Sequence, residues 1–346
     1  MAALQENLVG LTKKDYDGAK STLCVGCGHN SIANQVIQVA YELSVQPHEI
    51  IKLSGIGCSS KSPTYFLGRS HGFNSLHGRM PSVGTGALMA NHSLKALGVS
   101  GDGDTGSIGM GQFKHIMRRN VRMVYVVENN GVYGLTKGQF SATAEEGHEL
   151  KYAGRNDLPP INLCLEAVIS GCGFVARSFA GDAKQVRELL KAALAHRGTA
   201  VLDIISPCVA FNNDDRSPKS YAYGKANEQP LHDIGFIPGF VPQQEEIVVT
   251  DHEPGEMRVI EMHDGSAVQL RKLEHDYDPR DRAQAIMRLE EAEAKQEFIT
   301  GLIYYNAERE NFAEANDLVD APLARLSDAQ LRPSKASLDK VMQELM

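Results

Sequence analysis

The sequence lacks several features that would assign it to a broad class of protein. Its 346 residues carry a formal net charge of −8, whereas a nucleic-acid-binding protein is expected to present a basic face. No run of about 18 apolar residues occurs, and the first residues contain no basic segment followed by an apolar one, so neither membrane spanning nor export is indicated. There is no internal repeat and no low-complexity tract. These absences predict a soluble, cytoplasmic protein with no nucleic-acid or membrane partner.

Cysteine is too scarce for a disulfide framework. The chain has six cysteines, and two of them form Cys24-Val25-Gly26-Cys27 in a glycine-containing turn ahead of a near-helical apolar pattern. Such a pair fits metal binding in a reducing compartment better than a disulfide, although its spacing alone serves zinc, redox disulfides and clusters alike. Cys164 lies inside an apolar helical pattern and Cys172 at a helix-to-strand junction, so both are expected to be small buried hydrophobes.

The stretch 101–139 has the pattern of a socket for a diphosphate and its divalent metal. The turn 101–104 (Gly-Asp-Gly-Asp) follows a short apolar strand, and such a turn brings backbone N–H groups close to an anion. Asp102 offers a hard oxygen ligand suited to Mg²⁺, and Asn130 and the carbonyl of Val132, after the next strand, offer further oxygen ligands. Two ordinary turns of an α/β fold would explain either half alone. Both halves at this spacing favour the cofactor socket.

Alternating strand and helix patterns predict an α/β fold with a parallel sheet covered by helices on both faces. Ligands bind at the carboxyl edge of such a sheet, where Cys58, His77 and Cys208 are also expected. By spacing alone, a surface or hydrogen-bonded core histidine is the commoner explanation of His77. Residues 140–160 are expected to form a mobile loop. The predicted strands are 50–53, 96–99, 121–128, 174–177 and 200–206, and the predicted helices are 163–170 and 182–197.

The chain is expected to divide into three parts. Residues 1–20 form an N-terminal arm that lies on a partner or on the core, residues 21–240 form the cofactor-binding domain, and residues 241–346 form an extension that contacts a partner subunit. Within the extension, the predicted elements are a β-ribbon of 245–250 and 258–262 followed by an Asp264-Gly265 turn, a charged helix over 279–300 and a short helix over 336–346.

Several independent motifs resemble the β subunit of the 2-oxoacid:ferredoxin oxidoreductases. The resemblance covers residues 20–220. The segments that match the family are LCVGCGHNSI (23–32), SGIGCSSK (54–61), HGRMPSVGTG (77–86), GDGDTGSIGMGQF (101–113), RRNVRMVYVVENNGVYGLTKGQ (118–139) and SPC (206–208). The sequence departs from the family at Val25, where many relatives have proline, and at Ser60, where many have glycine. Neither departure removes a ligand, so they bear on the potential of a cluster and the rigidity of its loop.

The resemblance implies a thiamine diphosphate-binding fold with a C-terminal extension, and a subunit that binds thiamine diphosphate, Mg²⁺ and one [4Fe-4S] cluster. Carried over to this sequence, the cluster ligands are Cys24, Cys27, Cys58 and Cys208, and the Mg²⁺ ligands are Asp102, Asn130 and Val132. The implied cofactor-binding residues are Gly57, Cys58, Ser59, His77, Gly101, Gly103, Asp104, Leu135 and Thr136, and the implied catalytic residues are His77 and Lys137.

The implied activity is the oxidative decarboxylation of a 2-oxoacid, in either direction. Coenzyme A takes the acyl group, and single electrons leave through the cluster to ferredoxin, while the thiamine supplies the chemistry of decarboxylation. The segments KLEHDYDPRDR (272–282) and GLIYY (301–305) look like the group that converts 2-oxoglutarate to succinyl-CoA and CO₂. In the family, the position of Lys137 lies near the substrate, where an ammonium could pair with the second carboxylate of 2-oxoglutarate; a loop lysine is more usually only solvated. The family's catalytic glutamate belongs to an α subunit, so the chain is expected to work only as a heteromer.

Three alternatives remain at this point. The substrate could be pyruvate or a broad range of 2-oxoacids, because the same lysine resembles one in relatives that accept several substrates. The chain could also be a cluster-free thiamine diphosphate decarboxylase or carboligase subunit with structural cysteines. Finally, four cysteines fit a zinc-stabilised interaction protein, but that protein would leave the pairing of Asp102 with Asn130 unexplained.

Overall fold

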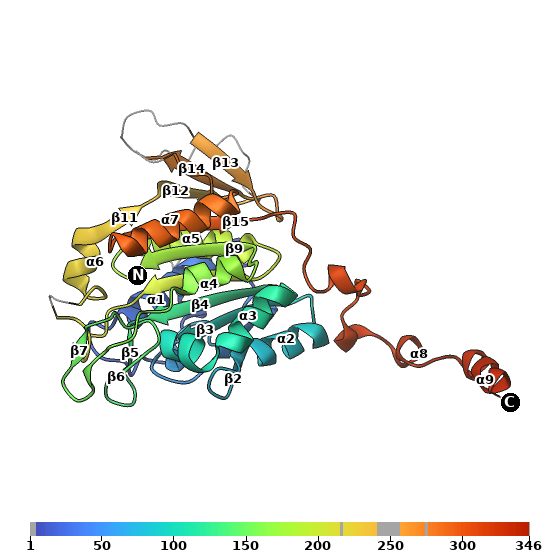
Figure 1. Ribbon diagram of the computed structural model, residues 1–346. Helices are drawn as coiled ribbons and strands as arrows, with labels where there is room; N and C mark the ends of the chain where they lie inside the picture. Colours follow the sequence, from blue (N-terminus) through green and yellow to red (C-terminus); the bar gives the residue numbers. More distant parts are fainter. Residues whose placement is uncertain (1–4, 215–216, 241–256, 274–275, 346) are drawn as a thin grey trace.

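The computed structural model describes residues 5–214, 217–240, 257–273 and 276–345. Its main sheet has eight strands: β1 (Ile50–Ser54), β2 (His71–Asn74), β3 (Lys95–Gly101), β4 (Met123–Asn129), β9 (Phe174–Phe179), β10 (Ala200–Ile205), β11 (Glu228–Pro230) and β15 (Phe298–Tyr305). The order across the sheet is β11-β15-β9-β10-β4-β3-β1-β2 (Figure 1). The strands from β2 to β9 in this order are parallel, as predicted. At the other side of the sheet, β15 runs antiparallel to β9, and β11 follows the direction of β15.

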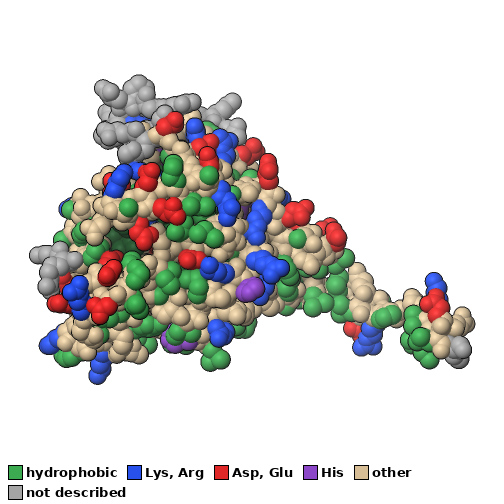
Figure 2. Space-filling model, viewed as in Figure 1, with side chains coloured by type: hydrophobic (Ala, Val, Ile, Leu, Met, Phe, Trp, Pro, Cys, Tyr) green, Lys and Arg blue, Asp and Glu red, His purple; other side chains and the backbone are tan. Residues whose placement is uncertain are grey.

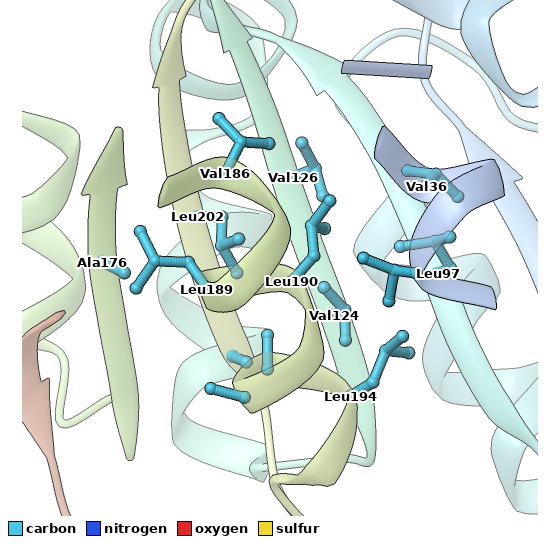
Figure 3. Packing of buried hydrophobic residues seen from close by; sticks show 14 of the residues in the cluster. Val36, Leu97, Val124, Val126, Ala176, Val186, Leu189, Leu190, Leu194 and Leu202 are labelled. Carbon is cyan, nitrogen blue, oxygen red and sulfur yellow. The ribbon is translucent and has the colours of Figure 1, made fainter. Parts of the chain in front are cut away.

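Helices cover both faces of the main sheet, also as predicted. One face carries α1 (Gly28–Glu42) and α5 (Ala183–Ala195), and the other carries α2 (Met80–Ala90), α3 (Met110–Arg119), α4 (Leu163–Ile169) and α7 (Arg282–Ala294). Figure 3 shows how α5 packs: Leu189 and Leu190 point at strand residues that include Val124 and Leu202. Each buried leucine of this kind contributes roughly 1.5–3 kcal/mol through removal from water. The periodic apolar face of α5 therefore fixes the helix on the sheet.

The predicted helix over 279–300 is wrong at its C-terminal end. Helix α7 ends at Ala294, and Gln296 takes a left-handed conformation with φ 56°. All eight residues of β15 are buried in the main sheet. A short continuous apolar run fits a buried strand as well as a buried helix segment, and here sheet pairing decided the outcome. The predicted extension thus completes the main sheet, although the division of the chain at residue 240 remains a prediction.

A second sheet lies beside the main one, with order β12-β14-β13. Its antiparallel strands are β12 (His232–Ile237), β13 (Met257–Glu261) and β14 (Ala267–Lys272). The predicted Asp264-Gly265 turn joins β13 to β14, where Gly265 has φ 80°. The other predicted strand of the ribbon, 245–250, lies outside the described residues. Shorter elements are β5 (Val132–Tyr133), β6 (Gln139–Phe140), β7 (Glu149–Leu150), β8 (Gly154–Arg155) and α6 (Tyr221–Asn227).

The two ends of the chain behave differently. In the N-terminal arm, Tyr16 is fully buried and its hydroxyl donates to the carbonyl of Val45 at 2.8 Å, so the described part of the arm lies on the core. The C-terminal end instead leaves the body and finishes in α8 (Asp328–Leu331) and α9 (Lys335–Glu344) (Figure 1). Helix α9 exposes Leu338, Val341 and Met342, and Figure 2 shows hydrophobic side chains along this tail. Within the described residues, no helix is long and apolar enough to cross a membrane.

The strand order also fixes where a ligand can bind. From β1 the chain proceeds outward to β2, whereas from β3 it proceeds in the opposite direction to β4. Loops that leave adjacent parallel strands in opposite directions open a crevice at the carboxyl edge of the sheet. The loops after β1 and β3 are those that carry Cys58 and Asp102.

Candidate functional site

A pocket of about 430 Å³, open to solvent, lies at this crevice. It is formed mainly by the loops that follow β1, β3 and β4. Twelve of the residues predicted from sequence line it: Gly57, Cys58, Ser59, His77, Gly101, Asp102, Gly103, Asp104, Asn130, Val132, Leu135 and Thr136. Other lining residues were not singled out from sequence, namely His29, Ile56, Glu128, Tyr133 and Gly134. The structure therefore brings the glycine-rich turn, the asparagine turn and one cysteine together in a single cavity.

The buried carboxylate of Asp104 holds two of the loops in place. Its Oδ1 accepts from the backbone of Gly78 at 2.9 Å and is also bonded to Nδ1 of His77, while its Oδ2 accepts from Ser100 at 2.7 Å. The backbone of Gly55 lies so close to this carboxylate that a Cβ on Gly55 would be 1.7 Å from Asp104 Oδ2, so only glycine fits at this position. The carboxylate is thus occupied in shaping the pocket. Direct contact of Asp104 with a cofactor remains a prediction.

Asp102 is buried at the bottom of the pocket within a ring of hydrogen-bond donors. Its Oδ2 accepts from the backbone of Gly131 at 3.0 Å, from the hydroxyl of Thr143 at 2.6 Å and from the hydroxyl of Ser141. Burial raises the pKa of Asp102, and these hydroxyl donors and the charge of Lys219 oppose that shift. Ser141 and Thr143 belong to the segment expected to be a mobile loop, but both are buried. No signal in the sequence pointed to them.

Asp102 and Asn130 meet directly, as their spacing predicted. The backbone N–H of Asn130 donates to Asp102 Oδ1 at 3.4 Å, and the side-chain oxygen of Asn130 accepts from the N–H of Val132 at 3.0 Å. In the described part of the chain, no group of three or more His, Cys, Asp or Glu side chains is arranged to hold a metal ion. The groups that contact Asp102 are backbone N–H groups and hydroxyls. The hard ligands available here are the carboxylate of Asp102 and the side-chain oxygen of Asn130, which suit Mg²⁺ better than zinc.

Glu128 and His29 form a buried polar pair in the wall of the pocket. Ser62 donates to the Glu128 carboxyl at 2.9 Å and 3.0 Å, and His29 Nδ1 lies 3.5 Å from Glu128 Oε2 and 2.6 Å from the Ser206 hydroxyl. Burial raises the pKa of Glu128 well above its usual range and lowers that of His29 to about 4. Burial therefore disfavours the charged form of each group. A single acidic residue within an otherwise apolar strand was the signal that could have identified Glu128.

The loops that carry the four predicted cluster ligands lie beside this pocket, although within the described residues their side chains are not arranged as a metal site. Cys27 caps the start of α1, and the N–H of the next residue donates to the carbonyl of Pro207 at 3.3 Å, which joins the Cys24–Cys27 turn to the Cys208 loop. A Cβ on Gly134 would lie 3.5 Å from the sulfur of Cys58 and 3.6 Å from that of Cys208. Burial raises the pKa of Cys27 to about 12, with smaller contributions from negative charge on Glu128, Cys208 and Cys58. Cationic iron beside these thiols would favour their ionised form.

The remaining predicted residues have different surroundings. Cys164 and Cys172 are fully buried, as predicted. Lys137 has φ 77° in an exposed turn, and it is not among the residues that line the pocket. Tyr133, which was not singled out from sequence, connects the second half of the motif to the first, because its hydroxyl donates to the carbonyl of Gly103 at 2.9 Å.

Two family models match the chain. One, described as "Thiamine pyrophosphate enzyme, C-terminal TPP binding domain", matches residues 55–204, which contain most of the pocket. The other, described as the C terminal of the pyruvate ferredoxin oxidoreductase beta subunit, matches residues 268–320. The second match covers β15 and the start of the tail, so the similarity continues beyond the pocket.

Curated relatives and a solved structure are also similar to the chain. The 2-oxoacid:ferredoxin oxidoreductase subunit beta of Saccharolobus solfataricus is 41% identical over 55% of this chain and 63% of the relative. The 2-oxoglutarate synthase subunit KorB of Methanocaldococcus jannaschii is 32% identical over 54% of this chain and 69% of the relative. The matched part thus spans less than two thirds of the first relative's length. A 2-oxoglutarate:ferredoxin oxidoreductase from Magnetococcus marinus, with 2-oxoglutarate, coenzyme A and succinyl-CoA bound, gives a TM-score of 0.71 with 28% identity over 97% of this chain and 96% of that one.

Proposed function

The chain belongs to the β subunits of the 2-oxoacid:ferredoxin oxidoreductases, and on this premise we propose that it is the thiamine diphosphate-binding subunit of a 2-oxoglutarate:ferredoxin oxidoreductase. In the proposed reaction 2-oxoglutarate, coenzyme A and two oxidised ferredoxins give succinyl-CoA, CO₂, a proton and two reduced ferredoxins. One observation carries the proposal: Cys58 lines the same pocket as Asp102 and Asn130. An electron carrier held by Cys58 would therefore lie beside the cofactor that is oxidised.

Asp102, Asn130 and the carbonyl of Val132 are proposed to hold the Mg²⁺ that binds the diphosphate. Support comes from the contact between the Asp102 carboxylate and the backbone N–H of Asn130, and from the position of both residues in the lining of the pocket. Divalent charge would keep this buried carboxylate ionised. Gly103 lets the ring of Tyr133 pack directly on the backbone of the turn 101–104, since a Cβ there would lie 2.5 Å from the ring. When bound, thiamine diphosphate supplies the carbanion that attacks the 2-oxo carbon and the ring that accepts the electrons of decarboxylation.

Cys24, Cys27, Cys58 and Cys208 are proposed to bind one [4Fe-4S] cluster. Support comes from the position of Cys58 and Cys208, whose sulfurs both lie close to Gly134. Cys164 and Cys172, in contrast, are fully buried in the core. His29 and Glu128 lie between the start of α1 and the pocket, and burial disfavours the charged form of each.

His77 is proposed to act on the substrate from the pocket wall. Its Nδ1 is bonded to the Asp104 carboxylate, which fixes the ring and leaves Nε2 to accept or donate a hydrogen bond. Gly57, Ser59, Leu135 and Thr136 are proposed to contact the thiamine from the rim of the same cavity. Lys137 is proposed to bind the second carboxylate of 2-oxoglutarate, which requires its exposed turn to fold toward the pocket.

An α subunit is the proposed partner, with ferredoxin as electron acceptor. The test is to purify the chain with and without its α subunit and to follow ferredoxin reduction with 2-oxoglutarate and coenzyme A. Activity should require both subunits, both substrates and added thiamine diphosphate, and it should be lower with pyruvate. Full activity of the chain alone, or reduction that does not depend on coenzyme A, would contradict the proposal.

A further inference from the structure

A second cavity lies at the opposite, amino-terminal edge of the main sheet. It encloses about 1230 Å³, including space open to solvent. Lys95 at the start of β3 and Arg122 just before β4 contribute positive charge to its wall, whereas Glu49 and Asp264 contribute negative charge. Leu194 and Phe236 contribute apolar surface. None of these residues lines the pocket that carries Asp102. The cavity is therefore a separate space at the other ends of the two strands that carry the proposed cofactor motif.

Arg122 lacks the partners that a partly buried arginine normally has. Its Nε is buried and has no hydrogen-bond partner, and within the described residues no ion pair of Arg122 is formed within 4.0 Å. Glu49 and Asp264 attract the guanidinium only at longer range, and burial lowers the pKa of Arg122. A guanidinium presents five N–H donors in a rigid fork. Buried donors without partners are uncommon in proteins, and an unseen bound group is one explanation for them.

Lys95 places a second positive charge near Arg122. Its ammonium donates to the carbonyl of Leu194 at 2.9 Å. Burial and, to a smaller extent, repulsion by Arg122 lower the pKa of Lys95 to about 8. Asp264 attracts both cations, and its Oδ1 already accepts from the backbone and the hydroxyl of Ser266. Glu49 and Asp264 also line the cavity, but neither forms an ion pair within 4.0 Å with Lys95 or Arg122 in the described part of the chain, so the Arg122 guanidinium can still pair with an added anion.

We propose that this cavity binds a small organic anion, whose carboxylate or phosphate pairs with Arg122 and Lys95 while its apolar part packs on Leu194 and Phe236. A planar carboxylate or a phosphate matches the guanidinium fork and can accept two hydrogen bonds from it. The apolar surface favours a ligand with a hydrocarbon portion over an inorganic ion. This site is independent of the proposed reaction, since it shares no residue with the catalytic pocket.

The test uses the full chain, alone and in its complex, with three probes: hexanoate, phenyl phosphate and the uncharged hexanamide. Calorimetric titration should show saturable binding of at least one anion, and the comparison of hexanoate with phenyl phosphate identifies the preferred group. Hexanamide should bind at least tenfold more weakly than hexanoate if the carboxylate is preferred. Arg122→Gln should weaken anion binding by about tenfold or more. The matched change Arg118→Gln, at an exposed position of α3, should leave it unchanged.

Chemical modification provides a second measurement if Arg122→Gln does not fold. In the unmodified chain, phenylglyoxal should react with Arg122, and saturating anion should slow that reaction without affecting Arg118. No saturable binding of either anion, equal binding of hexanoate and hexanamide, or no protection of Arg122 would overturn the proposal. Binding by the free chain that disappears in the complex would also overturn it, because a partner side chain would then be the natural occupant.

Discussion

The hydroxyl of Thr143 lies 2.6 Å from Oδ2 of Asp102 and 2.8 Å from Oδ1 of Asn129, so one side chain connects the turns after β3 and β4. A residue outside every predicted motif thus orients the carboxylate proposed to bind Mg²⁺. This connection makes the role of Asp102 testable without removing the carboxylate itself.

Thr143→Val keeps the shape of the side chain and removes its hydroxyl. Loss of a hydrogen bond to a buried charged group costs about 1.5–3 kcal/mol, so the affinity for thiamine diphosphate and Mg²⁺ should fall by about tenfold or more. Calorimetric titration measures this affinity, and thermal unfolding checks the fold. Thr64→Val, at an exposed position, is the control. Equal cofactor affinity in both variants would remove Thr143 from the site.

Cys58→Ser should remove most of the iron bound by the anaerobically purified chain. Cys164→Ser is the matched control, because Cys164 is fully buried in α4 and does not belong to the proposed set of four ligands. Iron and acid-labile sulfide are measured per chain, together with absorption near 400 nm. Equal loss of iron in the two variants would refute the ligand assignment, and bound zinc in place of iron would favour a structural metal site.

Stability should fall as the solution is acidified below about pH 6.5, because several buried histidines are neutral in the fold. Burial lowers the pKa of His196 to about 3 and that of His232 to about 4. Between these values and about 6.5 the unfolded chain binds more protons than the folded chain, so the free energy of unfolding decreases as pH falls. Each such group contributes up to about 1.4 kcal/mol per pH unit. Below about pH 3 their contribution to the slope should vanish.

His196→Phe isolates one of these groups. Neither ring nitrogen of His196 has a hydrogen-bond partner, and the ring packs near Phe174 and Tyr305. The variant should therefore lose no hydrogen bond and should show a shallower decline in stability between pH 6.5 and 4. Urea unfolding at several pH values measures the slope, with His115→Phe, at an exposed position, as the control. An unchanged slope would mean that His196 is not held neutral.

Lys137→Ala should lower kcat/KM for 2-oxoglutarate by about ten- to a hundredfold and affect pyruvate little. The reason is that only 2-oxoglutarate has a second carboxylate for the ammonium to bind. The measurement uses the complex with the α subunit, with Lys151→Ala, on the exposed turn after β7, as a control for loss of surface charge. An equal decrease for both substrates would make Lys137 a general structural or cofactor residue.

The exposed face of α9 should bind the α subunit. Leu338→Asp together with Val341→Asp would place charge on that face and should weaken the complex, measured by analytical ultracentrifugation, without changing thermal stability or cofactor binding. Both side chains are about half exposed, and α9 contains no buried residue, so the two changes should disturb little of the packing within the chain. Asp339→Asn changes the same helix without altering its apolar positions. If the complex of the double variant were as tight as the original, the tail would have no part in assembly.

The sequence was sufficient for the parts of the site that depend on local backbone chemistry. Glycine-rich turns at strand ends and the Asp102 and Asn130 spacing identified the loops that meet in the pocket, because parallel strands bring their carboxyl ends to one edge. The sequence did not identify Ser141, Thr143 or Lys219, because an isolated hydroxyl or amine carries no periodic signal. Tertiary folding brings the two hydroxyls into contact with Asp102 and the charge of Lys219 near it. The strand β15 was missed for a related reason: pairing with β9, rather than local preference, decides its conformation.

The position of β15 has a consequence for how the chain folds during synthesis. Strand β9 is shielded on one side by β10, and on its other side by β15, which the ribosome makes much later. Until residue 305 has emerged, the backbone N–H and C=O groups on that side of β9 remain open to pairing with another nascent chain. Folding of the main sheet must also wait for a contact of long sequence separation, which slows it. Truncated chains that end near residue 240 are therefore expected to aggregate, whereas shortening the chain within the tail leaves this strand pair intact.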